Sequence, residues 1–178
     1  EDVKFAVLTE VCSFVNSEMP HEQQLSAIVD AANNLIGVKD SSLILYDEQT
    51  DTIRFPFRYE NGEEKPTAPR KINREKKGRT EEIFLTGGSI FIQTKKESKE
   101  WYRQPDRQEF VGNPYTSWIG VPMRLGERTL GVIATYHMTQ DYVYDRDDLD
   151  ILQTMANLAA IALENSRLYQ QVGEQIVE

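Results

Sequence analysis

The sequence predicts an α+β domain in which helices cover at least one face of a largely antiparallel sheet. Three observations predict this class: apolar residues recur at helical spacing at both ends of the chain, alternating patterns lie between them, and most connections are short. The 178 residues, of which 39% are hydrophobic and 28% charged, suit one domain with a substantial hydrophobic core.

The N-terminal part of the chain carries two amphipathic helical patterns. We expect one helix over residues 2–17 and a second after Pro20, which suits a first helical turn because proline has no N–H to leave unpaired. Gly37 should end the second helix, because glycine readily adopts the left-handed conformation. The apolar stripe of this second helix comprises Leu25, Ile28, Val29, Ala32, Leu35 and Ile36. Each stripe needs a partner surface.

The pattern then changes to two expected strands. Residues 41–47 are apolar on both faces, which predicts a central strand. Pro56, within residues 52–59, cannot donate a hydrogen bond to a neighbouring strand, so we expect an edge strand or a bulge there. The polar stretch 60–77 that follows is too long for a tight hairpin turn. Strict alternation would place four residues of the second strand on one face: Ile53, Phe55, Phe57 and Tyr59.

The middle of the chain is less regular. We expect a short helix over residues 80–86, capped by Thr80 and ended by Gly87, and then a short strand over residues 89–93. Residues 94–115 mix aromatic and charged side chains without a clear period. A long excursion of this kind inside a compact domain is typical of a binding loop or lid.

The last part of the chain predicts a hairpin followed by a long helix. Residues 116–125 and 128–138 are strongly strand-like, and the Gly126-Glu127 connection fits a type II′ turn. Asp145 should cap the helix that follows. Toward its C-terminal end the pattern narrows to a seam near heptad spacing, in which Asn165 is a polar residue that could set the register: Ile161, Asn165, Leu168, Val172 and Ile176. This seam predicts either a dimeric coiled coil or a simple helical extension.

Charge and cysteine content exclude several classes of function. The formal net charge of −9 argues against direct nucleic-acid binding, which requires a basic face. The single cysteine, Cys12, cannot form an internal disulfide or a paired-thiol site, and we interpret it as a small buried core residue. One cysteine suits a reducing cytoplasm, where we expect the protein to reside. No apolar run is long enough to insert into a membrane, and helical patterns at both chain ends suggest a piece of a longer protein.

Several segments, in order, resemble the GAF domain family. Residues 119–169 contain IGVPM, a glycine hairpin, LGVI, an acidic helix start and a helix ending in AAIALENSRLY, which is similar to the C-terminal half of that family. Residues 25–55 and the stretch GRTEEIFLTGGSIFIQ at 78–93 resemble the preceding elements. The resemblance covers roughly Gln23 to Tyr169.

This resemblance implies a definite architecture. It implies a central six-stranded antiparallel sheet with the N- and C-terminal helices on one face, and a pocket covered by loops and short helices on the other. We accordingly divide the chain into an N-terminal linker or signalling helix (1–19), a GAF domain (20–169) and the start of a C-terminal signalling helix (170–178). The family also implies a regulatory role, in which occupancy or dimer geometry is passed along the exit helix to an output module.

The chemistry of known GAF domains can be tested against the sequence. Residues 38–144 contain no cysteine for covalent bilin attachment, so we expect no covalent bilin, and the cyclic-nucleotide signature with its Asn-Lys pair is absent. A GAF-type methionine sulfoxide reductase would need paired cysteines. Only His21 and His137 could contribute imidazole to a metal or haem site, so we expect no metal site and no cofactor. The sequence therefore predicts no catalytic residues and no enzyme.

Two features stand out as candidates for ligand binding. Aromatic residues concentrate in the mid-chain region, where they either line a pocket or fill it as core. With His137, the candidate pocket residues are Phe91, Trp101, Tyr102, Phe110, Tyr115, Trp118 and His137. The second feature is a basic run that we interpret as a mobile, solvated loop, with attraction of an anionic ligand or an acidic partner as the alternative. The run consists of Lys65, Arg70, Lys71, Arg74, Lys76, Lys77 and Arg79.

These features favour a small-molecule-sensing GAF domain of a larger signalling protein, such as a histidine kinase of a two-component system. Its expected partners are an unknown small-molecule ligand, the output domain of the same polypeptide and a second copy bound through the terminal helices. The alternatives are a ligand-free GAF module that dimerises and transmits geometry, or the effector domain of a DNA-binding regulator. A hollow polar pocket would favour sensing, whereas a cavity filled by Trp118 and its neighbours would favour the ligand-free module.

Overall fold

The computed structural model describes residues 21–37, 40–110 and 114–177. The expected helix at 2–17, the N-terminal segment 1–19 and Cys12 lie outside these residues. The described helices are α2 (His21–Ile36), α3 (Arg79–Thr86), α4 (Lys95–Tyr102) and α5 (Arg146–Val177). The described strands are β1 (Ser41–Asp47), β2 (Thr52–Glu60), β3 (Glu63–Glu64), β4 (Arg70–Lys71), β5 (Ile90–Ile92), β6 (Ser117–Leu125) and β7 (Arg128–His137).

The strands form one antiparallel sheet in the order β3-β2-β1-β7-β6-β5, and the short β4 pairs with β2 beside this path. The predicted α+β class and the six-stranded antiparallel sheet are confirmed. β1 lies between β2 and β7, as its apolar faces predict. In the β6–β7 hairpin, Leu125 pairs with Arg128 across a two-residue turn whose Gly126 has φ of 63°.

The proline in β2 produces a bulge that changes which residues share a face. Opposite β1, Leu43 pairs with Phe57, but Leu45 pairs with Arg54, so one extra residue of β2 lies between these pairs. Because side chains alternate along a strand, this extra residue reverses the alternation. Ile53 therefore faces one side of the sheet and Phe57 the other. The predicted bulge is confirmed, and the prediction that all four apolar residues of this strand share one face is wrong.

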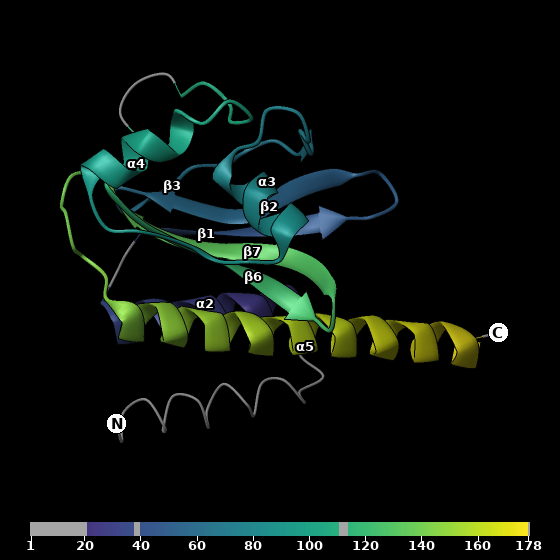
Figure 1. Cartoon of the computed structure of the whole chain (residues 1–178). Helices are drawn as coiled ribbons and strands as arrows, with labels where there is room; N and C mark the ends of the chain where they lie inside the picture. The colour runs from purple at the N-terminus through teal and green to yellow at the C-terminus, as the bar shows by residue number, and fades with distance from the viewer. Residues whose placement is uncertain (1–20, 38–39, 111–113, 178) are drawn as a thin grey trace.

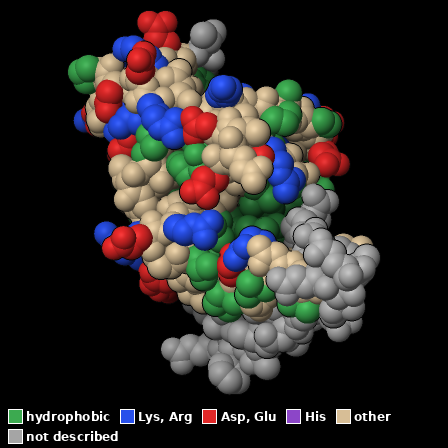
Figure 2. Space-filling model, turned by 90° about the vertical axis from the view of Figure 1, so that its right-hand side faces the viewer, with side chains coloured by type: hydrophobic (Ala, Val, Ile, Leu, Met, Phe, Trp, Pro, Cys, Tyr) green, Lys and Arg blue, Asp and Glu red, His purple; other side chains and the backbone are tan. Residues whose placement is uncertain are grey.

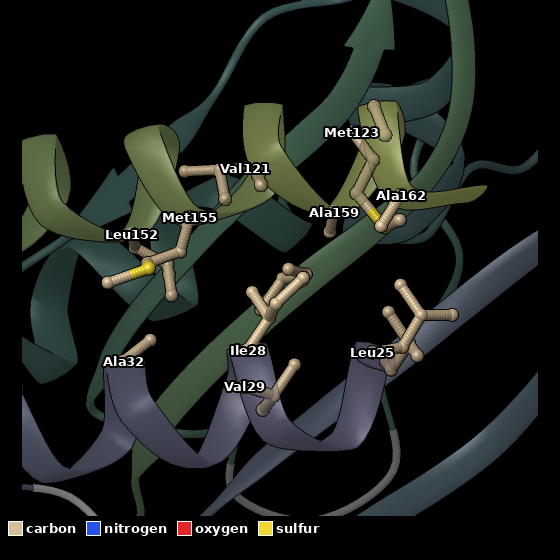
Figure 3. Packing of buried hydrophobic residues seen from close by; sticks show 14 of the residues in the cluster. Leu25, Ile28, Val29, Ala32, Val121, Met123, Leu152, Met155, Ala159 and Ala162 are labelled. Carbon is tan, nitrogen blue, oxygen red and sulfur yellow. The ribbon is translucent and has the colours of Figure 1, made fainter. Parts of the chain in front are cut away.

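Helices lie on both faces of the sheet (Figure 1). The long α5 and α2 run across one face, and the short α3 and α4 cover the other. On the first face, the facing sides of α2 and α5 interdigitate over β6 (Figure 3), as the two amphipathic stripes require. The labelled residues of this core are Leu25, Ile28, Val29, Ala32, Val121, Met123, Leu152, Met155, Ala159 and Ala162.

Most helix ends are set by local chemistry. Gly37 ends α2 with φ of 81°, and Gly87 ends α3 with φ of 71°, both as predicted. At the start of α5, the carboxylate of Asp145 accepts a hydrogen bond from the backbone N–H of Asp148, and Asp148 accepts one from the N–H of Asp145, at 3.0 Å each. This reciprocal pair confirms the predicted cap and acts as a capping box.

Two predictions for the middle of the chain are wrong. Helix α3 begins at Arg79 after Gly78, which makes no side-chain cap, so Thr80 lies inside the helix and does not cap it. The chain also makes a tight turn directly after β2, where Asn61 and Gly62 both have positive φ and connect β2 to β3. The carboxylate of Asp40 accepts the backbone N–H groups of both turn residues at 2.9 Å, which fixes this turn from a distant segment.

Helix α5 continues well past the sheet. It runs without interruption from Arg146 to Val177, through the predicted boundary at residue 170, and projects beyond the strands (Figure 1). In the part of the chain that the structure describes, no helix is both long and apolar enough to cross a membrane.

Candidate functional site

The candidate site lies on the sheet face beneath α3 and α4. A second hydrophobic cluster, separate from the α2–α5 core, joins this face of the sheet to the two short helices. Partly buried Phe84 of α3 and Trp101 of α4 pack against it from above. Its buried members are Ile44, Ile53, Ile72, Ile83, Ile92, Trp118, Val132, Ala134 and Tyr136.

A charged side chain is buried at the edge of this cluster. Arg79, the first residue of α3, is only 4% exposed. Its guanidinium carbon lies 4.7 Å from the ring centre of Tyr102, 5.3 Å from that of Trp118 and 5.5 Å from that of Trp101. Rings at these distances attract a cation through their negative faces, so α4 and β6 together form an aromatic cage around Arg79.

Ser98 of α4 supplies the polar contacts of Arg79. One terminal nitrogen of the guanidinium donates to the Ser98 hydroxyl at 2.7 Å and to the Ser98 carbonyl at 3.2 Å. The Ser98 hydroxyl in turn donates to the carbonyl oxygen of Tyr115. Arg79 Nε is buried and has no hydrogen-bond acceptor among the described residues. The guanidinium is thus held by neutral groups and incompletely hydrogen-bonded.

Among the described residues, Arg79 also has no carboxylate within ion-pair distance. Glu81, two residues further along α3, is fully buried, but its carboxylate is engaged by Arg70 in two hydrogen bonds of 2.6 and 2.9 Å. Burial without a counter-charge lowers the pKa of Arg79 to about 10. The group still carries its charge at neutral pH.

A second arginine close by is paired in the ordinary way. The guanidinium carbon of Arg107 lies 4.4 Å from the ring centre of Trp101, so Trp101 has an arginine neighbour besides Arg79. Arg107 donates to Glu82 at 2.8 Å, and Lys77 contacts the same carboxylate at 2.8 Å. This network joins the segment after α4 to α3. The contrast with Arg107 makes the lack of a carboxylate at Arg79 the distinctive feature of the site.

The floor of the site depends on Gly120 of β6. A Cβ atom placed on Gly120 would lie 2.2 Å from the Trp118 ring and 2.6 Å from the Ile83 side chain. Such distances are far below van der Waals contact. The absence of a side chain at Gly120 therefore lets the Trp118 ring lie over the strand, beneath α3 and beside Arg79.

The structure brings most of the predicted pocket residues together. Trp101 and Tyr102 of α4 meet edge to face at 4.9 Å between ring centres, and both contact Arg79 together with Trp118. Tyr115 stacks on Tyr136 with ring centres 4.2 Å apart. These aromatic side chains therefore pack against one another and against the second hydrophobic cluster in this conformation.

Three predicted residues lie apart from the cage or at its margin. Phe91 of β5 packs on the α2–α5 core, on the opposite face of the sheet. His137 ends β7, and its Nδ1 accepts the backbone N–H groups of Thr139 and Gln140 at 3.2 and 3.1 Å, so it stabilises the turn after the strand. Phe110 is 40% exposed and contacts the Tyr102 ring at 5.0 Å.

Three important residues were not among the predicted pocket residues: Arg79, Ser98 and Tyr136. Tyr136 pairs with Trp118 because the register of the β6–β7 hairpin shifts between Met123 and Arg124, so strict pairing counted from the turn would not have identified it. Arg79 was counted with the basic run, and nothing in the local sequence separates it from the exposed members of that run. Ser98 has no sequence signal, since its role arises only from the packing of α4 on α3.

The basic run is not a freely solvated loop. Arg70 binds Glu81, Arg74 binds Asp51 at 2.5 and 2.7 Å, and Lys77 binds Glu82 and Asp106. The expectation of a solvated run is therefore wrong for these residues, and most clearly for buried Arg79. Most positive charges of this run are paired with carboxylates that are close in space. These carboxylates come from segments that are far apart in the sequence.

A separate groove lies at the other end of the sheet. It has a volume of about 630 Å³ and lies between the end of β1 and the second half of α5. Figure 2 views this end of the molecule, where hydrophobic side chains form the bottom of a recess with basic side chains at its rim. Two of its arginines have acidic neighbours: Arg167 contacts Glu164 at 2.5 Å and Arg128 contacts Glu48 at 3.8 Å. The groove therefore lacks the uncompensated charge found at Arg79.

An antiparallel sheet with a terminal helix pair on one face and a cover of short helices on the other defines the GAF fold. The chain belongs to the GAF domain family, since the model of the family described as GAF domain matches residues 18–164. The resemblance inferred from the sequence motifs is thereby confirmed.

Solved structures with the same fold come from proteins of different function. The GAF domain of an Acinetobacter phosphoenolpyruvate-protein phosphotransferase is 15% identical, with a TM-score of 0.65, 94% of this chain and 96% of that chain covered. A segment of a methyl-accepting chemotaxis protein is 14% identical, with a TM-score of 0.69 and coverage of 92% and 99%. Free methionine-R-sulfoxide reductase from Neisseria meningitidis, solved with its substrate, is 17% identical, with a TM-score of 0.67 and coverage of 95% and 94%. At these identities the likeness establishes the fold alone.

Proposed function

We propose that this chain is a non-catalytic sensory domain of a larger cytoplasmic signalling protein. In this proposal a small molecule binds beneath α3 and α4, and its presence is passed through α5 to an output module of the same polypeptide. The domain would act by population shift, because a ligand that favours one arrangement of the cover over another changes the balance between them.

The observation that carries the proposal is the position of β6 between the cage and the exit helix. Trp118 of β6 contacts Arg79 on one face of the sheet. Ile119 and Val121 of the same strand face the α2–α5 core on the other. The Gln153 side chain of α5 also donates a hydrogen bond to the Pro122 carbonyl at 3.1 Å. Strand β6 alone separates Trp118 from α5. A displacement of Trp118 would therefore reach α5 directly through this strand.

The absence of catalysis is part of the proposal. The chain contains one cysteine, so a thiol that attacks a substrate would have no second thiol in the same chain to resolve the product. The Nδ1 atom of His137, one of two histidines in the sequence, is occupied by backbone hydrogen bonds. These observations favour a binding role over the reductase activity of one structural neighbour.

A ligand-free module that dimerises and transmits geometry is the second candidate. The observation that favours it is the packing of the predicted pocket aromatics against one another. Trp118 is 6% exposed, and the Tyr115 ring stacks on Tyr136. If these rings always remain packed as core, no ligand binds beneath α3 and α4. The terminal helices alone would then transmit the signal.

Native mass spectrometry of the purified chain, compared with its denatured mass, tests the proposal. A reproducible excess mass that is lost on denaturation supports sensing and gives the mass of the ligand. Ligand removal by unfolding and refolding should then lower Tm, and adding the extracted small-molecule fraction should restore it, because a ligand that binds only the folded state stabilises it. A bare protein whose Tm does not respond to small-molecule extracts of the expression host would favour the ligand-free module.

A further inference from the structure

We infer that Arg79 is the anchor for a small organic anion, whose carboxylate or phosphate oxygens replace Ser98 as its hydrogen-bond acceptors. The inference rests on the proposed sensory function and specifies the chemical class of its ligand. It also identifies α4 as the part of the cover that the ligand moves, because Ser98 is the residue of α4 that now holds Arg79.

The first argument is the cost of burying this charge. A guanidinium removed from water loses much of its solvation in a protein interior, and a well-packed apolar residue usually serves stability at least as well. The three rings around Arg79 offset part of this cost through cation–π contacts. Ser98 contributes two neutral hydrogen bonds. A charge that must be buried without a counter-charge is poorly explained by packing alone.

The second argument is that the nearby acids are already used. Glu81 is held by Arg70 and by the backbone N–H of Asn73, and Glu82 is held by Lys77 and Arg107. Moving the Glu81 carboxylate to Arg79 would take it away from Arg70, and the Glu82 carboxylate is already shared by two basic groups. The missing counter-charge would therefore come from outside these residues, and a ligand can provide it.

The third argument concerns the donors and the cover. The guanidinium is planar, and its N–H groups match the two oxygens of a carboxylate or phosphate. Nε is buried without an acceptor among the described residues. The aromatic walls formed by Trp101, Tyr102 and Trp118 would contact the apolar body of such an anion. The ligand class is thus an oxyanion attached to an apolar or aromatic body.

The two tryptophans make this inference directly measurable. The sequence has two tryptophans, Trp101 and Trp118, and both contact Arg79. Their fluorescence therefore reports on this site. We would titrate the full chain with benzoate and with phenyl phosphate, using neutral benzamide as the matched control for shape. Concentrations up to about 20 mM are needed, because fragments of this size rarely bind more tightly than millimolar.

We expect benzoate, phenyl phosphate or both to change the fluorescence in a saturable way, and benzamide to give no saturable change. The stronger of the two anions distinguishes a carboxylate ligand from a phosphate ligand. Saturable binding of benzamide equal to that of the anions would overturn the inference while leaving a neutral-ligand sensor possible. No saturable response to either anion would also overturn it, whatever mass is found bound to the purified protein.

Variants separate an anion anchor from a structural arginine. Arg79→Gln should weaken anion binding at least about tenfold, as expected for the loss of a charge-assisted pair. Arg167→Gln is the matched control in the separate groove and should leave the titration unchanged. Ser98→Ala removes one acceptor that competes with the ligand and should increase affinity, which also keeps the test valid if Arg79→Gln fails to fold. Unchanged binding in Arg79→Gln, or no gain in Ser98→Ala, contradicts the inference.

Discussion

At the scale of single residues, the face beneath α3 is built around a glycine. Gly120 allows the Trp118 ring and the Ile83 side chain to occupy the space where a Cβ would otherwise lie. The same ring then contacts Arg79. The position of the cage is therefore determined by a residue without a side chain as much as by the aromatic residues that form it.

Gly120→Ala should destabilise the domain by about 1–3 kcal/mol, because the added methyl group overlaps the Trp118 ring and forces a shift in a packed cluster. Urea unfolding, followed by circular dichroism and tryptophan fluorescence, measures the change. Gly88→Ala is the control, since its nearest side-chain atom, Thr86 Oγ1, would be 3.6 Å from the new Cβ. Equal unfolding midpoints for the two variants would show that Trp118 can move aside freely.

At the scale of elements, α5 has a well-defined N-terminal end and a C-terminal part that extends beyond the sheet. The capping box of Asp145 and Asp148 fixes the start, next to the turn that follows β7. The first half of the helix then packs on β6 and α2. In the proposed function, a signal from the sheet would enter α5 through this half, so the stability of this half would matter for transmission.

Asp145→Ala should lower the free energy of unfolding by about 1 kcal/mol, because the backbone N–H of Asp148 loses its acceptor. The measurement is the urea midpoint at constant slope. Asp150→Ala, at an exposed position in the same helix, should change stability by less than about 0.5 kcal/mol, because the hydrogen bond from the Thr154 hydroxyl goes to the backbone carbonyl of Asp150 and survives the substitution. A loss at Asp150 as large as that at Asp145 would assign the effect to helix charge rather than to the cap.

At the scale of the whole molecule, the second half of α5 presents apolar side chains to solvent. Ile161, Leu168 and Val172 are each between 40% and 52% exposed. Their spacing follows the seam predicted from the sequence, which would place them on one side of a projecting helix. A second copy of the chain that covers this side would join two exit helices and bring two output modules together.

Leu168→Glu combined with Val172→Glu should convert a dimer to a monomer, because two carboxylates would be buried at a helix–helix contact. Sedimentation velocity over a range of concentrations measures the change in mass. The control is Tyr142→Glu, which places a charge at another exposed apolar residue, 68% exposed and outside α5. A wild-type chain that remains monomeric at every concentration would contradict dimerisation through this helix.

Local patterns in the sequence determined several elements of this domain. α2, β1, the β6–β7 hairpin and α5 follow from apolar periodicity and from turn and cap residues such as Gly37, Gly126 and Asp145. The order of these elements was enough to indicate the GAF family. These features could be predicted because each depends on residues a few positions apart, whose side chains share a face or a turn.

The sequence named the three rings around Arg79 among its candidates, but only the tertiary structure decided which candidates form the site. The bulge at Pro56 reversed the faces of β2, and Phe91 proved to face the α2–α5 core. Arg79 became a buried cation only because Ser98, nineteen residues away, and Trp118 approach it from other elements. Burial and charge pairing depend on strand register and on contacts between distant segments, and a single extra residue in a strand changes both. The sequence by itself therefore determined the elements and the family, while the packing of α3 and α4 on the sheet determined which residues form the cage.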